Sequence, residues 1–297
     1  MQSRQPLLTV AIPTYNCAHY LPDAVGSVMR QGLDDFELLI VDNASEDNSE
    51  DLVRSFGNKH IRYIRNPSNL GSRENGNRCM LNARGRYVKF LCADDVFLDG
   101  VLEKQLKILE SRPEVALVSC DHFITNEHLQ IEGIFHTFPG VHSGSRVINA
   151  CLSGVANYIG GPSNVMFRRE QAANLVADRS YNLLSDCKFY LQLLGRGGYV
   201  NIGTVGYLYR RHPNSDTEVN CPVDQRVSEH LRIVSEFDGW NPLSCVKALR
   251  IAGPEGWRAV GAHWREACRP GRIAMAAMSF PDLVHMYYLR HSTTIVR

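Results

Sequence analysis

The sequence predicts an α/β fold in which helices cover both faces of a mostly parallel sheet. Apolar, β-branched runs alternate with amphipathic stretches across residues 7–91, as in successive βαβ units. Aspartates follow three of the apolar runs, at Asp42, at Asp94 with Asp95, and at Asp121. Ligands of open α/β sheets bind beyond the carboxyl ends of the strands, so these aspartates mark the expected site.

The first part of the chain contains four expected strands, at residues 7–12, 36–41, 61–64 and 87–91. We expect Pro13 to stop the first strand, because proline lacks a backbone donor. Helices are expected within residues 16–32, 49–57 and 69–85, and a glycine lies at the end of each.

The later part of the chain is less regular. A helix with one apolar face follows Asp95, and a buried strand is expected at residues 115–120. Between residues 122 and 160 the pattern weakens, and the four histidines there lack metal-ligand spacing and are expected mostly at the surface. The remaining expected elements are a short strand near 165–169, a helix at 182–194 and closing strands at 199–202 and 206–210.

Composition excludes several classes of protein. The net charge is +1, which gives no field that favours nucleic acid. Nine scattered cysteines without a CxxC pair predict reduced thiols and no zinc site. The amino-terminal residues are polar, and no apolar run reaches the ~18 residues that span a membrane. We therefore expect a cytoplasmic protein.

The adjacent carboxylates of Asp94 and Asp95 have two interpretations. Like charges at a buried strand end repel each other, and a divalent cation held by oxygen ligands would offset that cost. Either residue could instead cap the following helix. Asp186, in the first turn of a later helix, could likewise serve only to complement the helix dipole. The placement of Asp42 at another strand end favours a binding site.

The common nucleotide-binding loops are absent from the sequence. A dinucleotide-dependent dehydrogenase places GxGxxG after its first strand, whereas residues 13–18 contain no glycine. The chain also has no GxxxxGK[ST] motif, which disfavours a P-loop nucleotidase.

Several stretches, taken together, resemble glycosyltransferase family 2, whose members have the GT-A fold. The likeness runs from Leu7 to about Ser215, in the order and spacing of the family. Its pieces are Val10–Asn16, Ile40–Ser45, Asn69–Gly71 with Asn77, Ala83–Val88, Leu91–Asp95, Ser185–Asp186 and Tyr209–Ser215. Each piece alone is weak, whereas the ordered set is specific.

The resemblance implies an inverting transferase that moves a sugar from a nucleotide-diphosphate sugar, usually a UDP-sugar, to an acceptor hydroxyl. It assigns Pro13, Tyr15 and Asp42 to the nucleobase pocket and makes Arg73 a further candidate for a nucleotide contact. The implied setting is polysaccharide or glycoconjugate biosynthesis, with a glycan, a lipid-linked sugar or a small molecule as acceptor.

The same resemblance implies that Asp94 and Asp95 contact the ribose and hold Mn²⁺ or Mg²⁺, with Asp95 as our first choice of ligand. Asp186 matches the general base, and His212 could reach the diphosphate from a mobile loop. These roles suit the chemistry, since a cation offsets the charge of the leaving diphosphate and a separate carboxylate removes the acceptor proton. Two positions depart from the family pattern: Cys92 replaces a frequent aspartate, and Ser185 replaces a usual glutamate.

We expect a GT-A catalytic domain at residues 1–222, with a nucleotide-binding half at about 1–121 and an acceptor-side half at about 122–222. Residues 223–297, which hold all three tryptophans, are expected to form a helical extension. That extension is either a structural appendage or a surface for the acceptor or the inner face of the membrane.

Two other functions would use a similar sheet. A sugar nucleotidyltransferase needs a glycine-rich, basic loop after the first strand, and residues 13–18 have neither glycine nor a basic residue. A non-catalytic nucleotide-sugar-binding module would not need to retain both the paired aspartates and Asp186. Both remain alternatives to the transferase.

Overall fold

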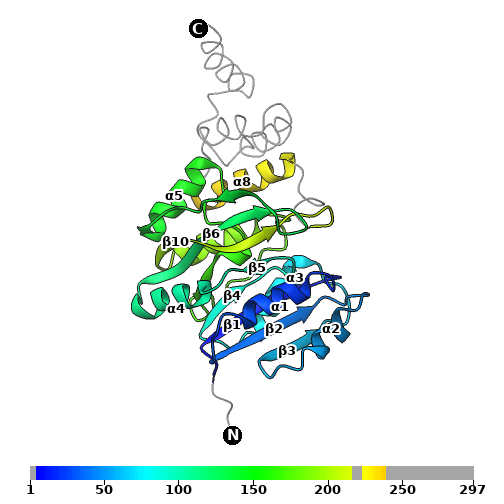
Figure 1. Ribbon diagram of the computed structural model, residues 1–297. Coiled ribbons are helices and arrows are strands. Elements are labelled where there is room, and N and C mark those ends of the chain that lie inside the picture. The colour runs from blue at the N-terminus through cyan, green and yellow to red at the C-terminus, as the bar shows by residue number, and fades with distance from the viewer. Residues whose placement is uncertain (1–4, 216–222, 239–297) are drawn as a thin grey trace, which may run out of the picture. The chain divides into compact units, whose positions relative to one another are not determined.

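The computed structural model describes residues 5–215 and 223–238. Their strands join in one mixed, mostly parallel sheet in the order β3-β2-β1-β4-β9-β6-β10-β5, with β7 beside β6 and β8 beside β10 (Figure 1). The strands are β1 (Leu8–Thr14), β2 (Phe36–Asp42), β3 (Ile61–Arg65), β4 (Tyr87–Phe90), β5 (Val96–Phe97), β6 (Val115–Thr125), β7 (Ile131–Phe135), β8 (Val141–His142), β9 (Met166–Arg168) and β10 (Gly198–Arg210).

Helices connect these strands and follow the sequence expectation closely in the first part of the chain. They are α1 (Leu21–Met29), α2 (Ser49–Ser55), α3 (Ser72–Asn82), α4 (Val101–Ser111), α5 (Gly144–Gly154), α6 (Ser185–Leu194) and α8 (Val223–Asp238), with a short 3-10 turn, η1 (Pro162–Asn164). The pairs β1–β2, β2–β3, β1–β4 and β6–β10 are parallel, which confirms the predicted α/β architecture.

The first strand does not stop at Pro13, as the sequence led us to expect, but continues to Thr14. Along β1, the backbone N–H and carbonyl groups of the odd-numbered residues point toward β4. The hydrogen bond from the Leu91 N–H to the Ala11 carbonyl is one example. Pairing with β4 ends at Ala11, whereas pairing with β2 continues to Thr14. The missing N–H of Pro13 therefore points to the side where no partner strand remains.

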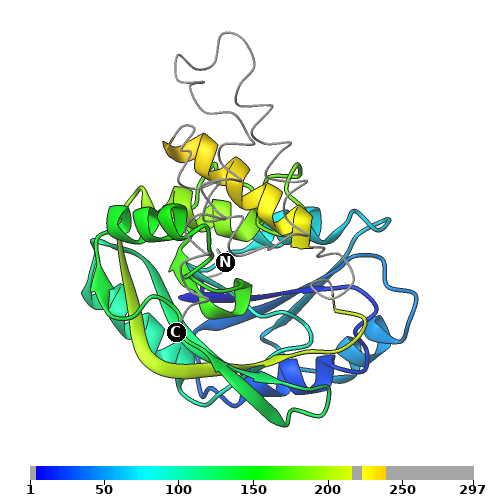
Figure 2. The ribbon, with the colours of Figure 1, turned by 90° about the horizontal axis from the view of Figure 1, so that it is seen from above.

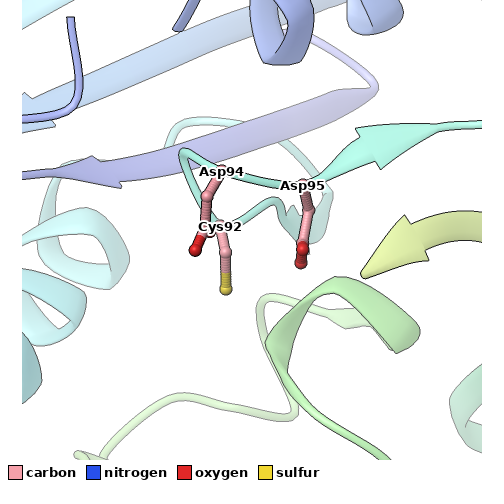
Figure 3. Close-up of side chains that lie close together, drawn as sticks. All are labelled: Cys92, Asp94 and Asp95. Carbon is pink, nitrogen blue, oxygen red and sulfur yellow. The ribbon is translucent and has the colours of Figure 1, made fainter. Parts of the chain in front are cut away.

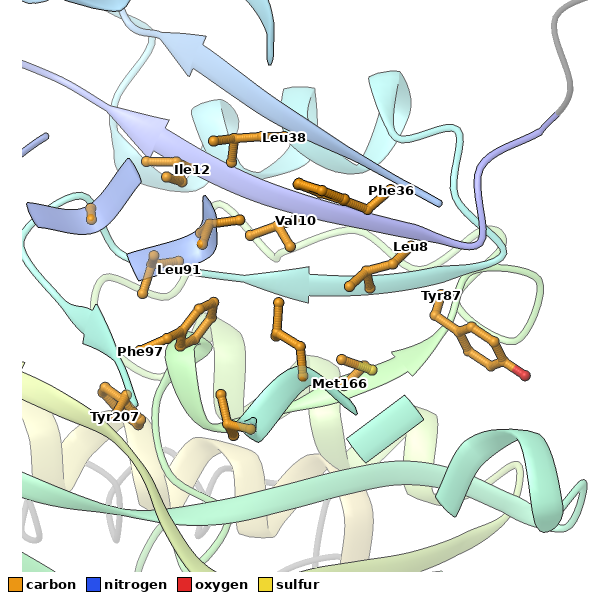
Figure 4. Packing of buried hydrophobic residues seen from close by; sticks show 14 of the residues in the cluster. Leu8, Val10, Ile12, Phe36, Leu38, Tyr87, Leu91, Phe97, Met166 and Tyr207 are labelled. Carbon is orange, nitrogen blue, oxygen red and sulfur yellow. The ribbon is translucent and has the colours of Figure 1, made fainter. Parts of the chain in front are cut away.

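Two apolar clusters cover the two faces of the sheet. On one face, alternate strand residues such as Val10 and Leu38 pack with apolar residues of α1, α2 and α4 (Figure 4). On the other face, Ala11, Leu39 and Val41 pack with Cys79 of α3. Helices on both faces make the strands apolar on both sides, as the sequence indicated.

The chain between residues 122 and 160 is more regular than its sequence predicts. β6 continues to Thr125, β7 returns beside it as an antiparallel strand, and α5 follows. Ile131 and Ile134 of β7 are largely exposed, so this strand lacks the alternation of a half-buried strand. The two expected closing strands are one strand, β10, which bends through register shifts between Asn201 and Tyr207 as it runs beside β6 (Figure 2).

The chain divides into two compact units. The larger comprises Met1–Ile148, Tyr158–Ser180 and Ser185–Glu218, and the smaller comprises Asn149–Asn157, Tyr181–Leu184 and Val219–Arg297. Within the smaller unit, the Glu229 carboxylate of α8 accepts hydrogen bonds from the backbone N–H groups of residues 182–184. Most of the expected carboxyl-terminal extension, residues 239–297 with all three tryptophans, lies outside the described residues. In the described part, no helix has both the length and the apolar character needed to cross a membrane.

Gly85 lets the turn before β4 approach β1, and this contact predicts a large effect of Gly85→Ala. A Cβ atom there would lie 2.6 Å from the Leu8 carbonyl carbon and 2.7 Å from the Tyr87 oxygen, and backbone atoms cannot move aside. We expect the free energy of unfolding to fall by more than ~2 kcal/mol in a urea titration. Gly76→Ala is the matched control, because open space surrounds this residue of α3 and alanine should stabilise the helix by ~1 kcal/mol. Equal midpoints for the two variants would contradict the prediction.

Candidate active site

The carboxyl end of β4 carries a short acidic segment, Cys92–Asp95, which we call the acidic turn. The Cys92 sulfur and one carboxylate oxygen each from Asp94 and Asp95 all lie within 4.8 Å of one another (Figure 3). β5 begins directly after the turn and pairs with β10, which fixes the turn on its carboxyl-terminal side. Carboxylate oxygens gathered in this way are suitable ligands for a divalent cation.

Asp95 is the buried member of the acidic turn, at 1% exposure. Its Oδ2 accepts a hydrogen bond from the Ser163 hydroxyl at 2.6 Å, and its Oδ1 accepts one from the Arg210 backbone N–H at 3.2 Å. The Ser163 oxygen also accepts the Cys92 N–H at 3.0 Å, so one side chain holds both ends of the turn. Burial and then the charge of Asp94 raise the pKa of Asp95 well above its ordinary value.

Asp94 is the more open carboxylate, and its partner is His212. The Oδ2 atom lies 3.0 Å from the His212 Nε2 atom. The imidazole is buried and packs against the Tyr20 ring, with 4.6 Å between the ring centroids. Among the described residues, the His212 Nδ1 atom has no hydrogen-bond partner. The structure thus places His212 against the acidic turn, on the chain segment that follows β10.

The buried guanidinium of Arg210 supports the acidic turn from the other side. Its Nε donates to the Asp94 carbonyl oxygen at 2.9 Å, and its Nη2 lies 2.7 Å from the Asp23 carboxylate. The guanidinium also stacks over the Tyr20 ring, 4.8 Å from the centroid. Arg210 is therefore occupied by contacts within the protein.

Lys89 is a second buried cation on this side of the sheet. Its amine is fully buried, 5.2 Å from the Phe97 ring centroid, and has no hydrogen-bond partner in the described part of the chain. Burial lowers its pKa to about 8, while the charges of Cys120 and Asp95 oppose this shift. Lys89 and Asp95 thus interact electrostatically inside the protein.

Asp186 lies in the first turn of α6 and acts on the acidic turn through its charge. Burial, then the charges of Asp95 and Asp94, raise the pKa of the Cys92 thiol well above its ordinary value, and Asp186 adds to this shift. The charge of Asp186 therefore acts on the Cys92 thiol, although the two residues are far apart in the sequence. Its Oδ1 also accepts the Cys187 N–H at 2.6 Å, in agreement with the helix-end interpretation.

Asp42, at the end of β2, is fully buried and already has several partners. Its Oδ1 accepts the Ser45 N–H at 2.8 Å, and its Oδ2 accepts the Arg65 guanidinium at 3.1 Å and the Tyr63 hydroxyl. Burial and the neighbouring carboxylate raise the pKa of Tyr63, so the hydroxyl remains a donor. Asp42 thus ties β2 to β3.

The other expected nucleotide contacts fall in two places. Asp42 pairs in register with Thr14, the last residue of β1, so Pro13 within the strand and the 43% exposed Tyr15 just after it are its near neighbours. Arg73, by contrast, lines a hollow of about 400 Å³ at the start of α3, together with Leu70, Gly71, Glu74, Arg78 and Arg179.

Sequence reasoning missed a network of asparagines at the same edge of the sheet. Asn43 donates to Asn69 at 2.7 Å, and Asn66 donates to Asn43 at 3.0 Å and to Asn75 at 2.9 Å. Asn75 of α3 in turn donates to the Val41 carbonyl at 2.9 Å. These bonds join the ends of β2 and β3 to α3. Asparagines that directly follow strands were the available signal.

Comparison with known proteins identifies related chains. The model of the family described as glycosyl transferase family 2 matches residues 9–174, which is more than half of the chain. An uncharacterised protein of Mycobacterium tuberculosis is 30% identical over 203 residues, which cover 65% of this chain and 63% of that protein. A putative teichuronic acid biosynthesis glycosyltransferase of Bacillus subtilis, TuaG, is 29% identical over 199 residues, which cover 66% and 75% of the two chains.

Solved structures share the fold. The S. aureus protein TarS, solved in complex with UDP-GlcNAc, matches with a TM-score of 0.64 at 14% identity over 86% of this chain and 80% of its own. A mannosyltransferase of Pyrobaculum calidifontis, solved with GDP-Man and Mn²⁺, matches with a TM-score of 0.58 at 15% identity over 99% and 82%. The chain therefore has the GT-A fold.

The contacts of Asp42 predict the effect of Tyr63→Phe. This change removes one of the donors to a buried carboxylate and leaves the Ser45 and Arg65 contacts in place. We expect a loss of about 1.5–3 kcal/mol in the free energy of unfolding, measured by denaturant titration. Tyr158→Phe, which removes a hydroxyl from a 38% exposed ring, should change it by less than ~0.5 kcal/mol. A Tyr63→Phe variant as stable as this control would show that the bond contributes nothing.

Proposed function

The chain belongs to glycosyl transferase family 2, and from this premise we propose that it moves a sugar from a nucleotide-diphosphate sugar to an acceptor hydroxyl. The observation that supports the proposal best is the cluster of Asp94 and Asp95 carboxylate oxygens at the carboxyl end of β4. Displacement at the anomeric carbon needs carboxylates that hold a cation at the leaving diphosphate and a separate carboxylate that takes a proton. A single direct displacement inverts the anomeric carbon.

We propose that Asp95 and Asp94 hold the divalent cation, Mn²⁺ or Mg²⁺. Their hard oxygen atoms suit either ion, and the raised pKa of Asp95 reflects a buried negative charge that a cation would relieve. The His212 imidazole, 3.0 Å from Asp94, lies where it can contact the ion or the diphosphate. When bound, the cation neutralises the charge that accumulates on the leaving diphosphate. The Cys92 thiol stays protonated and is a poor ligand for hard cations.

Asp186 is our proposed general base. Its carboxylate accepts the proton of the acceptor hydroxyl as the new oxygen–carbon bond forms and the bond to the diphosphate breaks. Because Asp186 is on α6 and the acidic turn follows β4, one carboxylate can act on the acceptor while the others hold the donor. The partial exposure of Asp186 leaves it open to a substrate.

We assign the nucleobase to the ends of β1 and β2. Tyr15 offers an exposed ring beside Pro13, and Asp42 offers a fixed carboxylate. A carboxylate has about four acceptor sites, and three bonds to Asp42 are accounted for, which leaves one for a base imide. Full burial of Asp42 means that a base reaches it only if the residues that cover it shift on donor binding. Arg73 is a weaker candidate, since it lines a hollow of its own.

The relatives guide the choice of substrates. TuaG is named for teichuronic acid biosynthesis, and TarS was solved with UDP-GlcNAc, which supports a UDP-sugar donor and a glycan acceptor. The mannosyltransferase was solved with GDP-Man, so a panel of nucleotide sugars is needed to determine which nucleobase the donor carries. Thermal shifts with and without Mn²⁺ provide that measurement. We place the reaction in polysaccharide or glycoconjugate assembly.

The nucleotidyltransferase alternative is disfavoured by the loop after β1. Such an enzyme needs free backbone N–H groups in this loop for a triphosphate. The Asn16 N–H is bonded to the Ser45 hydroxyl at 2.9 Å, and the Ala18 N–H is bonded to the Asp47 carboxylate at 2.9 Å. These two N–H groups are therefore already used in contacts within the protein.

The base assignment predicts that Asp186→Asn separates catalysis from donor binding. We expect kcat for sugar transfer to fall roughly 10²–10⁴-fold, because an amide cannot accept the proton. Donor affinity, measured by calorimetry with Mn²⁺, should remain within about twofold. Asp99→Asn, at an exposed position, is the matched control and should retain full activity. An active Asp186→Asn variant would remove the proposed base, and an inactive wild type that binds donors would favour the non-catalytic module.

The buried state of Asp95 predicts a pH-dependent cation affinity. A raised pKa means that the proton is retained at higher pH, so a cation must displace it and affinity should rise as pH rises. We expect Mn²⁺ to bind several-fold more tightly at about pH 8 than at about pH 6, with proton release detected as buffer-dependent heat. Cys92→Ala should keep this affinity within about twofold, whereas Asp95→Asn should abolish it. Binding that is independent of pH would argue against Asp95 as a ligand.

A further inference from the structure

A second hollow, of about 470 Å³, lies against the middle of β6. Its lining consists of Asp121, His136, Thr137, Phe138, Pro139 and Tyr158, and we call it the β6 hollow. Its volume is in the ~300–1,000 Å³ range of small-molecule sites. None of these residues belongs to the acidic turn or to the proposed nucleobase contacts.

A fixed polar pair forms one wall of the β6 hollow. The His136 Nδ1 atom lies 2.6 Å from the Asp121 Oδ2 atom, and the Asp121 Oδ1 atom accepts the Asn201 amide at 2.8 Å and the Thr137 N–H at 3.1 Å. Burial opposes ionisation of Asp121, but these hydrogen bonds outweigh it and lower its pKa. The carboxylate is therefore charged and held still. The Nε2 atom of His136 is on the opposite side of its ring from Asp121, and 66% of the side chain is exposed.

Aromatic rings and a proline form the other wall. Tyr158 is 38% exposed, and the Phe138 ring lies 6.4 Å from it between centroids. The Phe138 N–H donates to the Tyr158 carbonyl at 2.7 Å, which fixes the two residues to each other. Aromatic faces beside a few oriented polar groups suit a ligand that is apolar on one face and carries hydroxyls around its edge. A pyranose ring has this character.

The β6 hollow is connected to the acidic turn by a short segment of chain. Tyr158 lines the hollow, and five residues later Ser163 bonds Asp95 and the Cys92 N–H. Gly160 and Gly161 lie between them, so the segment presents little side-chain bulk. The Ser119 hydroxyl donates to the Ile159 carbonyl at 3.1 Å and holds the segment against β6. The two places therefore lie close together along the chain, within the larger unit.

We propose that the β6 hollow binds a neutral pyranose of the acceptor, at a subsite outside the site of transfer. The ring stacks on Tyr158, and its hydroxyl groups bond to Asp121 and the His136 Nε2 atom. An anionic ligand is disfavoured here, because it would be repelled by the negative charge of Asp121. The assignment of the pyranose to the acceptor rests on the proposed transfer function, whereas sugar binding at the hollow does not.

Saturation-transfer NMR tests the proposal with defined probes, the methyl glycosides of glucose, galactose, mannose and N-acetylglucosamine. We expect saturation transfer to at least one of them in the wild type. Tyr158→Ala and His136→Ala should each weaken that binding at least tenfold. Tyr158→Phe, which keeps the ring, and Glu132→Ala, an exposed change on β7, should leave it within about twofold. The exposure of Tyr158 and His136 allows these variants to fold, and matching melting temperatures verify it.

Two results would overturn the proposal: no signal from any of the four glycosides, or a signal that both alanine variants retain. Binding of nucleoside diphosphates with Mn²⁺, measured on the same samples, keeps this test separate from the proposed function. If the protein binds nucleotides but the alanine variants do not weaken glycoside binding, only the proposal for the β6 hollow is contradicted. If the wild type binds a glycoside but no nucleotide, only the proposed transfer function is contradicted.

Discussion

The organisation of the site depends on how the protein offsets several carboxylates gathered at one edge of its sheet. Arg210 contacts Asp23 and the backbone of Asp94, while its own N–H bonds Asp95. The last strand of the described sheet therefore supplies both the cation and the backbone donor that hold the acidic turn. Because Arg210 is buried, its attraction to these carboxylates is screened less by water than that of a surface residue would be. The acidic turn is held in this way only when β4 and β10 are both in place.

Local sequence patterns predict the first part of the fold well and the later part poorly. Buried strands such as Phe36–Asp42 are apolar on both faces and are recognisable alone. The effect of Pro13 was predicted wrongly. Whether β1 can continue through a proline depends on where its pairing with β4 ends, and only the tertiary structure shows this. The hairpin of β6 and β7 was missed because β7 is exposed, and the antiparallel placement of β9 between β4 and β6 depends on contacts distant in sequence.

For the site, the order of motifs in the sequence indicated which carboxylates to consider, but it could not predict the side chains that surround them. The charge of Asp186 acts on the Cys92 thiol, although the two residues lie far apart in the sequence, and its role as general base stays a prediction. Ser163 carries no motif of its own, yet it holds Asp95 from 68 positions away. Lys89 occupies an otherwise apolar strand, and its amine is fully buried. Such partners are invisible to local patterns because only the folded sheet brings them together.

The long β6–β10 pair connects the β6 hollow with the acidic turn. Asp121 pairs near Val205, and Thr125 pairs with Arg210 beside the acidic turn. Four residues of strand separate these positions, which sets them roughly 13 Å apart along β6. Strands stretch and compress very little, so the distance between these two positions is fixed by β6. A molecule that touches both ends must match a fixed length, and changes in the surrounding loops can alter what is held at either end without altering that length.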